Sequence, residues 1–272
     1  MSLSLAEVTA VVHELWPLSG AESWDASGLV SGDPAGDISS IHLAVDAVSD
    51  TVDEAIDVGA DLFLVHHPLL LRGVTTVAED RYKGALLARL IRANCALLAA
   101  HTNADVVADG VSDILAQRLQ LQNSQPITES SEPGTGIGRV GRLARPVTLG
   151  HLARVLADLL PATASGVRVA GDYAQEVQVV SLCGGAGDSL LAHPLVVGSD
   201  VYVTSDLRHH PASEAREQAK VSGGPALIDV SHWASEWLWL DTAAAQLRAA
   251  LPGISITVSD LRTDPWDFVV MH

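Results

Sequence analysis

The sequence predicts an α/β protein of two similar domains, in which helices flank the sheets. Hydrophobic residues make up 48% of the chain and aromatic residues only 4%, so Ala, Val and Leu supply most of the packing. That composition suits helices that pack on a Val/Ile/Leu-rich sheet. Strand-like and helix-like segments also alternate along the chain, which indicates parallel strands joined by right-handed crossovers. The length of 272 residues allows one large domain or two of ordinary size.

The first half of the chain shows this alternation clearly. Apolar residues recur at helical spacing from Leu5 to Leu15, and Pro17 ends the pattern, so a helix is expected there. Beyond this helix, strands are expected at 41–46, 61–65 and 95–100, with helices at 49–58 and 84–94 between them.

The second half follows a stretch without an apolar period. Residues 122–136, QNSQPITESSEPGTG, are polar and contain Pro and Gly, which is typical of a linker or a surface excursion. We therefore divide the chain into domains at 1–125 and 126–272. In the second domain, strands are expected at 139–145, 177–183, 200–204, 225–230 and 254–260, and helices at 149–160, after Pro211 and at 235–251.

Charge and cysteine content exclude several classes of protein. The formal charge of −17 repels phosphate backbones and anionic membranes, so we expect neither nucleic-acid nor membrane binding. The two cysteines, Cys95 and Cys183, lie far apart in apolar runs, which favours buried thiols over a disulfide or a cysteine-based zinc site. The N-terminus has no basic region like that of a signal peptide, and no apolar run is long enough to span a bilayer. The expected location is cytoplasmic.

Three of the expected strands end in side chains that can bind metal ions. These are His66 and His67 after 61–65, His101 and Asp105 after 95–100, and His232 and Glu236 after 225–230. Ligands of open α/β sheets collect beyond the carboxyl ends of the strands. Imidazole nitrogens and carboxylate oxygens suit zinc, iron, manganese or nickel. The spacing of four residues places His232 and Glu236 on one face of a helix.

Each of these motifs also has a purely structural interpretation. A His-His pair before a proline is often only a turn, and a histidine four residues before a glutamate is common on solvated helix faces. His101 and Asp105 can cap the next helix. Taken one at a time, each motif favours the structural interpretation. Three strand ends that all carry nitrogen and oxygen ligands together favour a metal cluster. This pattern does not fix the number of metal ions.

Seven segments in order along the chain resemble one known family, the GTP cyclohydrolase 1 type 2 homologues, which are the YbgI-like dinuclear metal proteins. The segments are WDASGL (24–29), LVHHPLLL (64–71), AAHTNAD (99–105), GGAGDS (184–189), TSDLRHH (204–210), DVSHWASEW (229–237) and SDLRTDPW (259–266). The resemblance implies two α/β domains with mixed sheets flanked by helices, a metal site between them and a toroidal homohexamer. It implies two divalent ions per subunit, held by His66, His67, Asp105, His232 and Glu236. Longer relatives carry an inserted middle domain, which the short stretch at 122–136 indicates is absent here.

The chain departs from this family at three positions near the motifs. Ala26, Ser205 and Ser231 stand where the resemblance leads us to expect Asn, Gly and Gly. None is a ligand, so the departures bear on the rim of the site and not on metal binding.

Four residues match family positions around the site, namely Asp25, His101, His209 and His210. They can orient the ligands, because metal-bound imidazoles and carboxylates need hydrogen-bonding partners. His209 and His210 can equally form an exposed turn before a helix. The glycines of GGAGDS can cradle an anion or make a tight turn that packs the strand against its helix.

Two metal ions bridged by a carboxylate activate water and polarise the group that the water attacks. The function predicted from the resemblance is therefore a metal-dependent hydrolase that acts on a nucleotide or a related heterocycle, as GTP cyclohydrolase does. Opening the guanine imidazole ring needs hydroxide attack at C8 and a proton for the leaving nitrogen, for which His101 and His210 are the candidates. The chain has no P-loop and no obvious Arg/Lys cluster for a triphosphate. The alternative is a non-catalytic metal-binding oligomer that serves as a scaffold, a metal store or a regulator.

Overall fold

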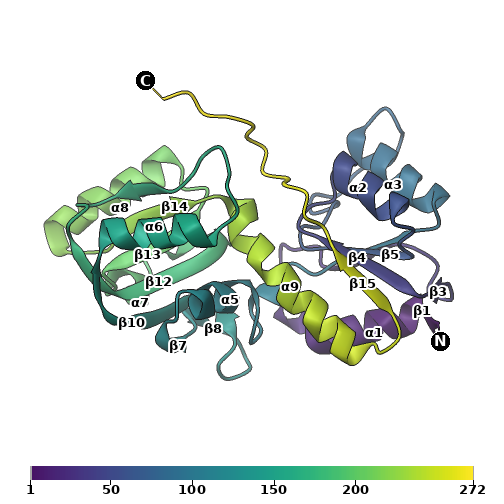
Figure 1. Cartoon of the computed structure of the whole chain (residues 1–272), viewed down its shortest axis with the longest axis horizontal. Coiled ribbons are helices and arrows are strands. Elements are labelled where there is room, and N and C mark those ends of the chain that lie inside the picture. Colours follow the sequence, from purple (N-terminus) through teal and green to yellow (C-terminus); the bar gives the residue numbers. More distant parts are fainter. Residues whose placement is uncertain (1, 272) are drawn as a thin grey trace. The chain divides into compact units, whose positions relative to one another are not determined.

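A computed structural model describes residues 2–271 and divides the chain into two compact α/β units (Figure 1). The first unit comprises Met1–Val107 and Leu240–Thr263, and the second comprises Ala108–Trp239 and Asp264–His272. The expected boundary between residues 125 and 126 differs from this division, because the chain returns to the first unit near its end. The return is explained by β15 (Ser255–Val258), which joins the first sheet by pairing in parallel with β4 (Ser40–Ala44).

The first unit contains a five-stranded mixed sheet. Its strand order is β15-β4-β5-β6-β2, with β5 at Leu62–Val65, β6 at Ala96–Ala99 and β2 at Gly28–Ser31. The first four strands are parallel, and β2 pairs with β6 in the antiparallel direction. Every residue of β5 and β6 is buried. This burial explains their unbroken apolar runs, because a parallel strand covered on both faces has no polar side.

Helices cover the sheet of the first unit and complete its core. α2 (Ser49–Asp57) and α3 (Tyr82–Arg92) pack side chains such as Val52 and Leu90 against Phe63. α1 (Leu5–Leu15) buries Leu5, Val8 and Val12 and begins in a capping box between Ser4 and Glu7. The smaller elements of this unit are β1 (Leu3–Ser4), η1 (Leu18–Gly20), β3 (Asp37–Ile38) and α4 (Thr102–Asp105).

The second unit contains a six-stranded mixed sheet in the order β11-β14-β13-β12-β10-β7. Its strands are β7 (Gln122–Gln125), β10 (Arg139–Thr148), β11 (Arg168–Ala170), β12 (Glu176–Ala186), β13 (Val201–Ser205) and β14 (Ala226–Val230). The three strands β12, β13 and β14 are parallel, and the other three run antiparallel to their neighbours. The mixed α/β class expected from the resemblance is therefore confirmed in both units.

The helices of the second unit follow the expected pattern, with α6 (Leu149–Leu159) between β10 and β11 and α8 (His209–Ser222) after β13. The shorter helices are α5 (Val111–Arg118), η2 (Asp188–Leu190) and α7 (Pro194–Val197). The stretch at 122–136 is more ordered than a linker. It supplies the edge strand β7 and a small hairpin of β8 (Thr128–Glu129) and β9 (Gly136–Ile137). All four residues of β7 are exposed, so the strand carries no apolar period that a sequence pattern can show.

The helix α9 (His232–Ala250) starts two residues after β14 and continues from the second unit into the first. It begins three residues earlier than expected, and His232 and Glu236 therefore lie one turn apart on the same helix. Ser231 caps the helix, because its Oγ accepts a hydrogen bond from the backbone N of Ala234 at 3.3 Å.

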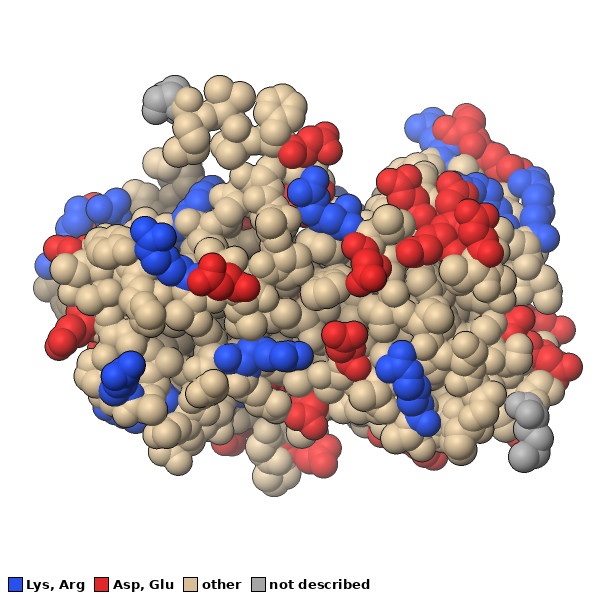
Figure 2. Space-filling model, viewed as in Figure 1, with Lys and Arg blue, Asp and Glu red and all other residues tan. Residues whose placement is uncertain are grey.

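The surface reflects the acidic composition of the chain. On the face drawn in Figure 2, acidic side chains gather over the region of α2, whose sequence SDTVDEAID contains four of them. Among residues 2–271, no helix is both long enough and apolar enough to cross a membrane.

Both cysteines are buried thiols, as expected. Burial raises the pKa of the Cys95 thiol to about 12. At pH 8 the thiolate fraction of Cys95 is therefore on the order of 10⁻⁴. In a Cys183→Ala variant, we expect Cys95 to react with a disulfide reagent very slowly in the native protein and fully in urea, as measured by the absorbance of the released thiolate.

A second variant supplies the control. Val221 is 84% exposed, so an added Val221→Cys change should create a thiol that reacts at once in the native protein. Equally fast reaction of Cys95 would contradict the buried position.

Candidate metal centre

The first group of candidate ligands lies at the carboxyl edge of the five-stranded sheet. His66 and His67 follow β5, and His101 follows β6 after one residue. The strand ladder continues past the strand ends, because the backbone N of His66 donates to Ala44 O at 3.1 Å and that of His67 donates to Val45 O at 2.8 Å. Since β5 and β6 are adjacent and parallel, their ends bring the three imidazoles to one place.

These three histidines form a compact cluster. The ring centroids lie 5.1 Å apart for His66 and His67, 5.2 Å for His66 and His101, and 5.4 Å for His67 and His101. Their potential ligand nitrogens all lie within 4.8 Å of one another. Asp105, the last residue of α4, places Oδ1 3.6 Å from His66 Nε2. The structure thus places the candidate ligands His66, His67 and Asp105 close together, with His101 beside them.

Each imidazole of this cluster is held through Nδ1 by an oxygen acceptor. The acceptor is Ala100 O for His66 at 2.9 Å, Asp46 Oδ1 for His67 at 2.7 Å, and Asp25 Oδ1 for His101 at 2.7 Å. An oxygen acceptor requires a proton on Nδ1, which leaves the electron pair of a neutral imidazole on Nε2. Metal-binding histidines in proteins are typically oriented in this way.

Asp25 anchors His101 through a dense hydrogen-bond network. Its carboxylate accepts from Ser27 Oγ at 2.7 Å, from Thr102 Oγ1 at 2.5 Å and from His101 Nδ1. Burial works against the charged form, but the hydrogen bonds from Thr102, His101 and Ser27 outweigh it and hold the pKa of Asp25 well below its usual range. Asp25 therefore stays ionised, as an acceptor for His101 must.

His101 itself is neutral at physiological pH. Burial and, to a smaller extent, the neighbouring His66 lower the pKa of its imidazole to about 4, although the contact with Asp25 acts in the opposite direction. The side chain of His101 does not cap α4, although the residue occupies the N-cap position. Its geometry therefore fits a metal ligand or a proton-transfer group, and not the structural role of a helix cap.

The second group of candidate ligands lies on the first turn of α9. His232 Nε2 lies 3.0 Å from Glu236 Oε1, and His232 Nδ1 lies 2.7 Å from Asp206 Oδ2. Burial alone would lower the pKa of His232, but the carboxylates of Glu236 and Asp206 raise it well above its ordinary value. The hydrogen bond to His232 lowers the pKa of Asp206. A pair of carboxylates that attracts a proton to this imidazole attracts a metal cation as well.

Two orienting residues were not found from the sequence. Asp46 accepts a hydrogen bond from His67 and lies just after β4 of the first sheet. Asp206 accepts one from His232 and lies just after β13 of the second sheet. Asp206 has a φ of 56°, which is uncommon for a residue with a side chain and is often found at functional sites. The strand-end rule that identified the histidines would have identified both aspartates.

The glycines at the end of β12 serve close packing. The backbone N of Gly184 donates to Ser112 Oγ at 3.1 Å and that of Gly185 donates to Ser235 Oγ at 3.0 Å, so these amides are already occupied. Gly185 has a φ of +68°, and a Cβ there would lie 2.5 Å from Glu236 Oε1. The tight-turn interpretation therefore accounts for these glycines, and Gly185 makes room for the Glu236 carboxylate.

His209 and His210 begin α8 and are exposed. Their rings lie 5.3 Å apart. Neither belongs to a group of possible metal ligands in the described part of the chain. Their position fits the exposed alternative, and the proposed role of His210 in proton transfer stays a prediction.

Comparisons with known proteins show the family to which this chain belongs. The chain belongs to the Duf34/NIF3 (NGG1p interacting factor 3) family, whose model matches residues 3–265. It is 47% identical over 269 residues to a "GTP cyclohydrolase 1 type 2 homolog" of Streptomyces coelicolor, covering 96% of this chain and 93% of the relative. A Mycobacterium tuberculosis protein of the same name is 35% identical, with 98% and 97% covered. The resemblance in the sequence motifs is therefore confirmed.

Solved structures show the same fold. A hypothetical protein of Staphylococcus aureus matches with a TM-score of 0.87 at 26% identity and covers 99% of this chain and 100% of its own. A Bacillus cereus protein related to NIF3 matches with a TM-score of 0.86 at 22% identity, covering 98% and 99%. The alignment with the Mycobacterium relative extends over 378 positions, against 272 residues here. That relative therefore contains more than one hundred residues that this chain lacks.

The contact of Gly185 with Glu236 gives a test of the second ligand group. We expect Gly185→Ala to weaken binding of Zn²⁺ or Mn²⁺ by about tenfold or more, because a methyl group there displaces the carboxylate. Competition with a fluorescent chelator measures the affinity.

Gly59→Ala is the matched control for backbone strain. Gly59 shares the φ of +68° but has nothing within 4 Å of the added Cβ. Each substitution should cost about 1–2 kcal/mol of stability from its left-handed conformation. Unchanged metal affinity in Gly185→Ala, or an equal loss in Gly59→Ala, would contradict the proposed contact.

Proposed function

We propose that this chain is a metal-dependent hydrolase that binds a pair of divalent ions and acts on a nucleotide or a related heterocycle. The proposed ligands are His66, His67, Asp105, His232 and Glu236. The observation that carries the proposal is the shared orientation of the histidines. His66, His67, His101 and His232 each have an oxygen acceptor at Nδ1, so each can present Nε2 to an ion.

The donor set fits a divalent metal. The ligand nitrogens of His66, His67 and His101 lie within 4.8 Å of one another, and Asp105 Oδ1 lies 3.6 Å from His66 Nε2. Imidazoles packed this closely repel one another when they are protonated. A metal ion binds their neutral forms and so avoids this repulsion. Glu236 is 3% exposed, and its buried carboxylate favours a cation beside it, which is the His232 imidazolium in this structure and a metal ion in the proposed site. Nitrogen and carboxylate donors suit zinc, manganese, iron or nickel.

A divalent ion in such a site lowers the pKa of water and polarises the group under attack. The chain supplies the groups that orient and transfer protons. Asp25 holds Nδ1 of His101, so Nε2 is the position at which His101 accepts or donates a proton. Asp46 and Asp206 keep His67 and His232 in fixed rotamers and tautomers. This arrangement supports hydrolysis, because its proton-transfer group lies next to the ligands.

The substrate class comes from the names of the relatives. GTP cyclohydrolase chemistry opens a heterocyclic C–N bond, with attack at C8 of guanine and transfer of a proton to the leaving nitrogen. His101 lies in the ligand cluster and is the first candidate for that transfer, and His210 is the second. The high negative charge of the chain disfavours a polyanionic substrate without bound metal, so we expect nucleotide turnover only in the metal-loaded protein.

Metal binding can be measured apart from activity. Elemental analysis of protein purified under metal-replete conditions should give two ions per chain. At a free metal concentration of about 100 Kd, one site stabilises the native state by about 2.7 kcal/mol, so added metal should raise Tm. The rise should be smaller in Glu236→Ala. Fewer than one ion per chain would argue strongly against the two-ion site.

Turnover tests the enzyme proposal. Metal-loaded protein should hydrolyse GTP or another member of a nucleotide panel, and His67→Ala should lower kcat/KM by about 10²-fold or more, as loss of a metal ligand does. His151→Ala is the matched control, because His151 is exposed on α6. Equal activity in the wild type and His67→Ala would exclude catalysis at this site. Stoichiometric metal without turnover would favour the scaffold, store or regulator.

A further inference from the structure

The segment after the last strand exposes an unusual amount of apolar surface. Trp266, Phe268, Val269, Val270 and Met271 are each between 59% and 85% exposed. Figure 1 shows this stretch without helix or strand as it leads to the C-terminus. In the described part of the chain, residues 267–271 make no hydrogen bond. We call residues 265–271 the C-terminal segment.

Such a segment has the properties of a strand that pairs with another sheet. Phe and Val favour extended structure, and the backbone donors and acceptors of residues 267–271 are unpaired. Contiguous exposed apolar side chains typically mark an interaction surface. An extended peptide of this kind binds by adding a strand to an exposed sheet edge, where its side chains fill neighbouring pockets. The family model ends at residue 265, so almost all of this segment lies outside the shared family sequence.

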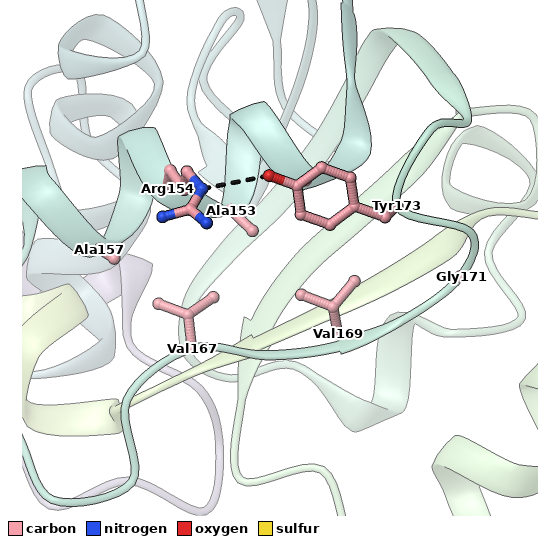
Figure 3. Close-up of a pocket in the computed structure, with 8 residues that line it drawn as sticks. Ala153, Arg154, Ala157, Val167, Val169, Gly171 and Tyr173 are labelled. Atoms are coloured by element: carbon pink, nitrogen blue, oxygen red, sulfur yellow. Dashed lines mark hydrogen bonds between the residues drawn. The ribbon is translucent and has the colours of Figure 1, made fainter.

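The second unit has a groove of matching chemistry between α6 and β11. Figure 3 shows Val167 and Val169 on one side of the cavity and Ala153 and Ala157 on the other. Its volume is about 330 Å³. Arg154 lies at the rim, where its Nε donates to the hydroxyl of Tyr173 at 3.1 Å. We call this cavity the α6–β11 groove.

The groove lies beside a free sheet edge. Among residues 2–271, β11 is the outermost strand of its sheet and pairs only with β14, through Arg168, Val169 and Ala170. Its other edge is open to a further strand. Val169, on the face toward α6, is 42% exposed. The small residues of α6 leave space above this strand, which a larger apolar side chain can fill.

The charge and the length of the C-terminal segment also match the α6–β11 groove. Arg154 makes no salt bridge in the described part of the chain, and Asp267 is exposed in the middle of the C-terminal segment. The seven residues 265–271 span about 23 Å when extended, which exceeds the length of β11 with its flanking residues. The segment therefore offers apolar side chains and one carboxylate to a groove with apolar walls and one guanidinium.

We propose that the C-terminal segment of one copy of this chain docks in the α6–β11 groove of a second copy, as an added strand beside β11. The start of the segment is fixed, because Ser231 Oγ donates to Asp264 Oδ2 at 2.5 Å and Trp266 N donates to Asp264 Oδ1 at 3.1 Å. Ser231 follows β14, which is the neighbour of β11. The segment thus starts near its own groove, yet none of residues 264–271 lines that cavity. The exposed apolar side chains are instead available to another copy.

Cross-linking of the full-length protein tests the proposal. Two differently tagged populations are prepared, one with Val169→Cys and one with Phe268→Cys, then mixed and treated with a short bis-maleimide. Docking raises the local concentration of one thiol at the other, so we expect the mixed-tag cross-link to exceed the control by at least about tenfold. The control pairs Phe268→Cys with Val221→Cys, an exposed position on α8 outside the groove. The buried native cysteines give the same background in both pairs.

A chain that carries both Val169→Cys and Phe268→Cys separates the alternatives. Cross-links only within one chain would show that the segment folds onto its own groove, and would overturn the proposal. Yields no higher than those of the Val221→Cys control would also overturn it. Cross-links between differently tagged chains support it.

A charge exchange tests the contact at the rim. Arg154→Asp in the Val169→Cys chain should lower the mixed-tag yield roughly two- to fivefold, the effect of one exposed ion pair. Asp267→Arg in the Phe268→Cys chain should restore it. Restoration is a result that a general loss of folding cannot give. Equal yields in all three forms would contradict the pairing of Asp267 with Arg154.

Discussion

Hydrogen bonds from imidazole Nδ1 to oxygen orient the four histidines of the candidate metal centre, and the proposed chemistry depends on them. Four histidines in two separate parts of the chain have the same arrangement, with a carbonyl or carboxylate at Nδ1 and Nε2 turned toward other ligands. An unrestrained histidine on a surface adopts several rotamers and either tautomer. Fixing both before a ligand arrives removes an entropic cost from metal binding. The sheets supply the acceptors that orient these histidines, because Asp46, Ala100 and Asp206 all lie at strand ends.

The two units position their candidate ligands with different secondary-structure elements. In the first unit, adjacent parallel strands deliver the histidines directly from their carboxyl ends. In the second unit, a helix begins just beyond the end of a strand, and the candidate ligands His232 and Glu236 lie one turn apart on this helix. Ser231 begins this helix and also holds Asp264. A position where the family resemblance leads us to expect glycine therefore orders the helix start and fixes the base of the C-terminal segment.

The proposed function and the proposed assembly use different surfaces of the second unit. The candidate metal ligands His232 and Glu236 follow a parallel strand, whereas the α6–β11 groove lies at the outer, antiparallel strand of the same sheet. Edge strands with exposed apolar neighbours tend to acquire a partner, and natural proteins cover or charge them. The C-terminal segment can cover the edge strand β11 without any change at the candidate ligand histidines. This separation lets a segment outside the family model vary while the metal chemistry stays the same.

The sequence by itself determined the α/β class, the buried strands and the positions of the candidate ligand histidines, because these features depend on the local order of residues. An unbroken apolar run that ends in a histidine predicts both a strand and what lies at its end. The tertiary structure decided what depends on distant partners. β15 joined the first sheet across more than two hundred residues, the polar strand β7 formed only because β10 lies beside it, and His101 entered the ligand cluster through Asp25. Pairing and burial between distant segments leave no periodic signal along the chain, and only the folded protein shows them.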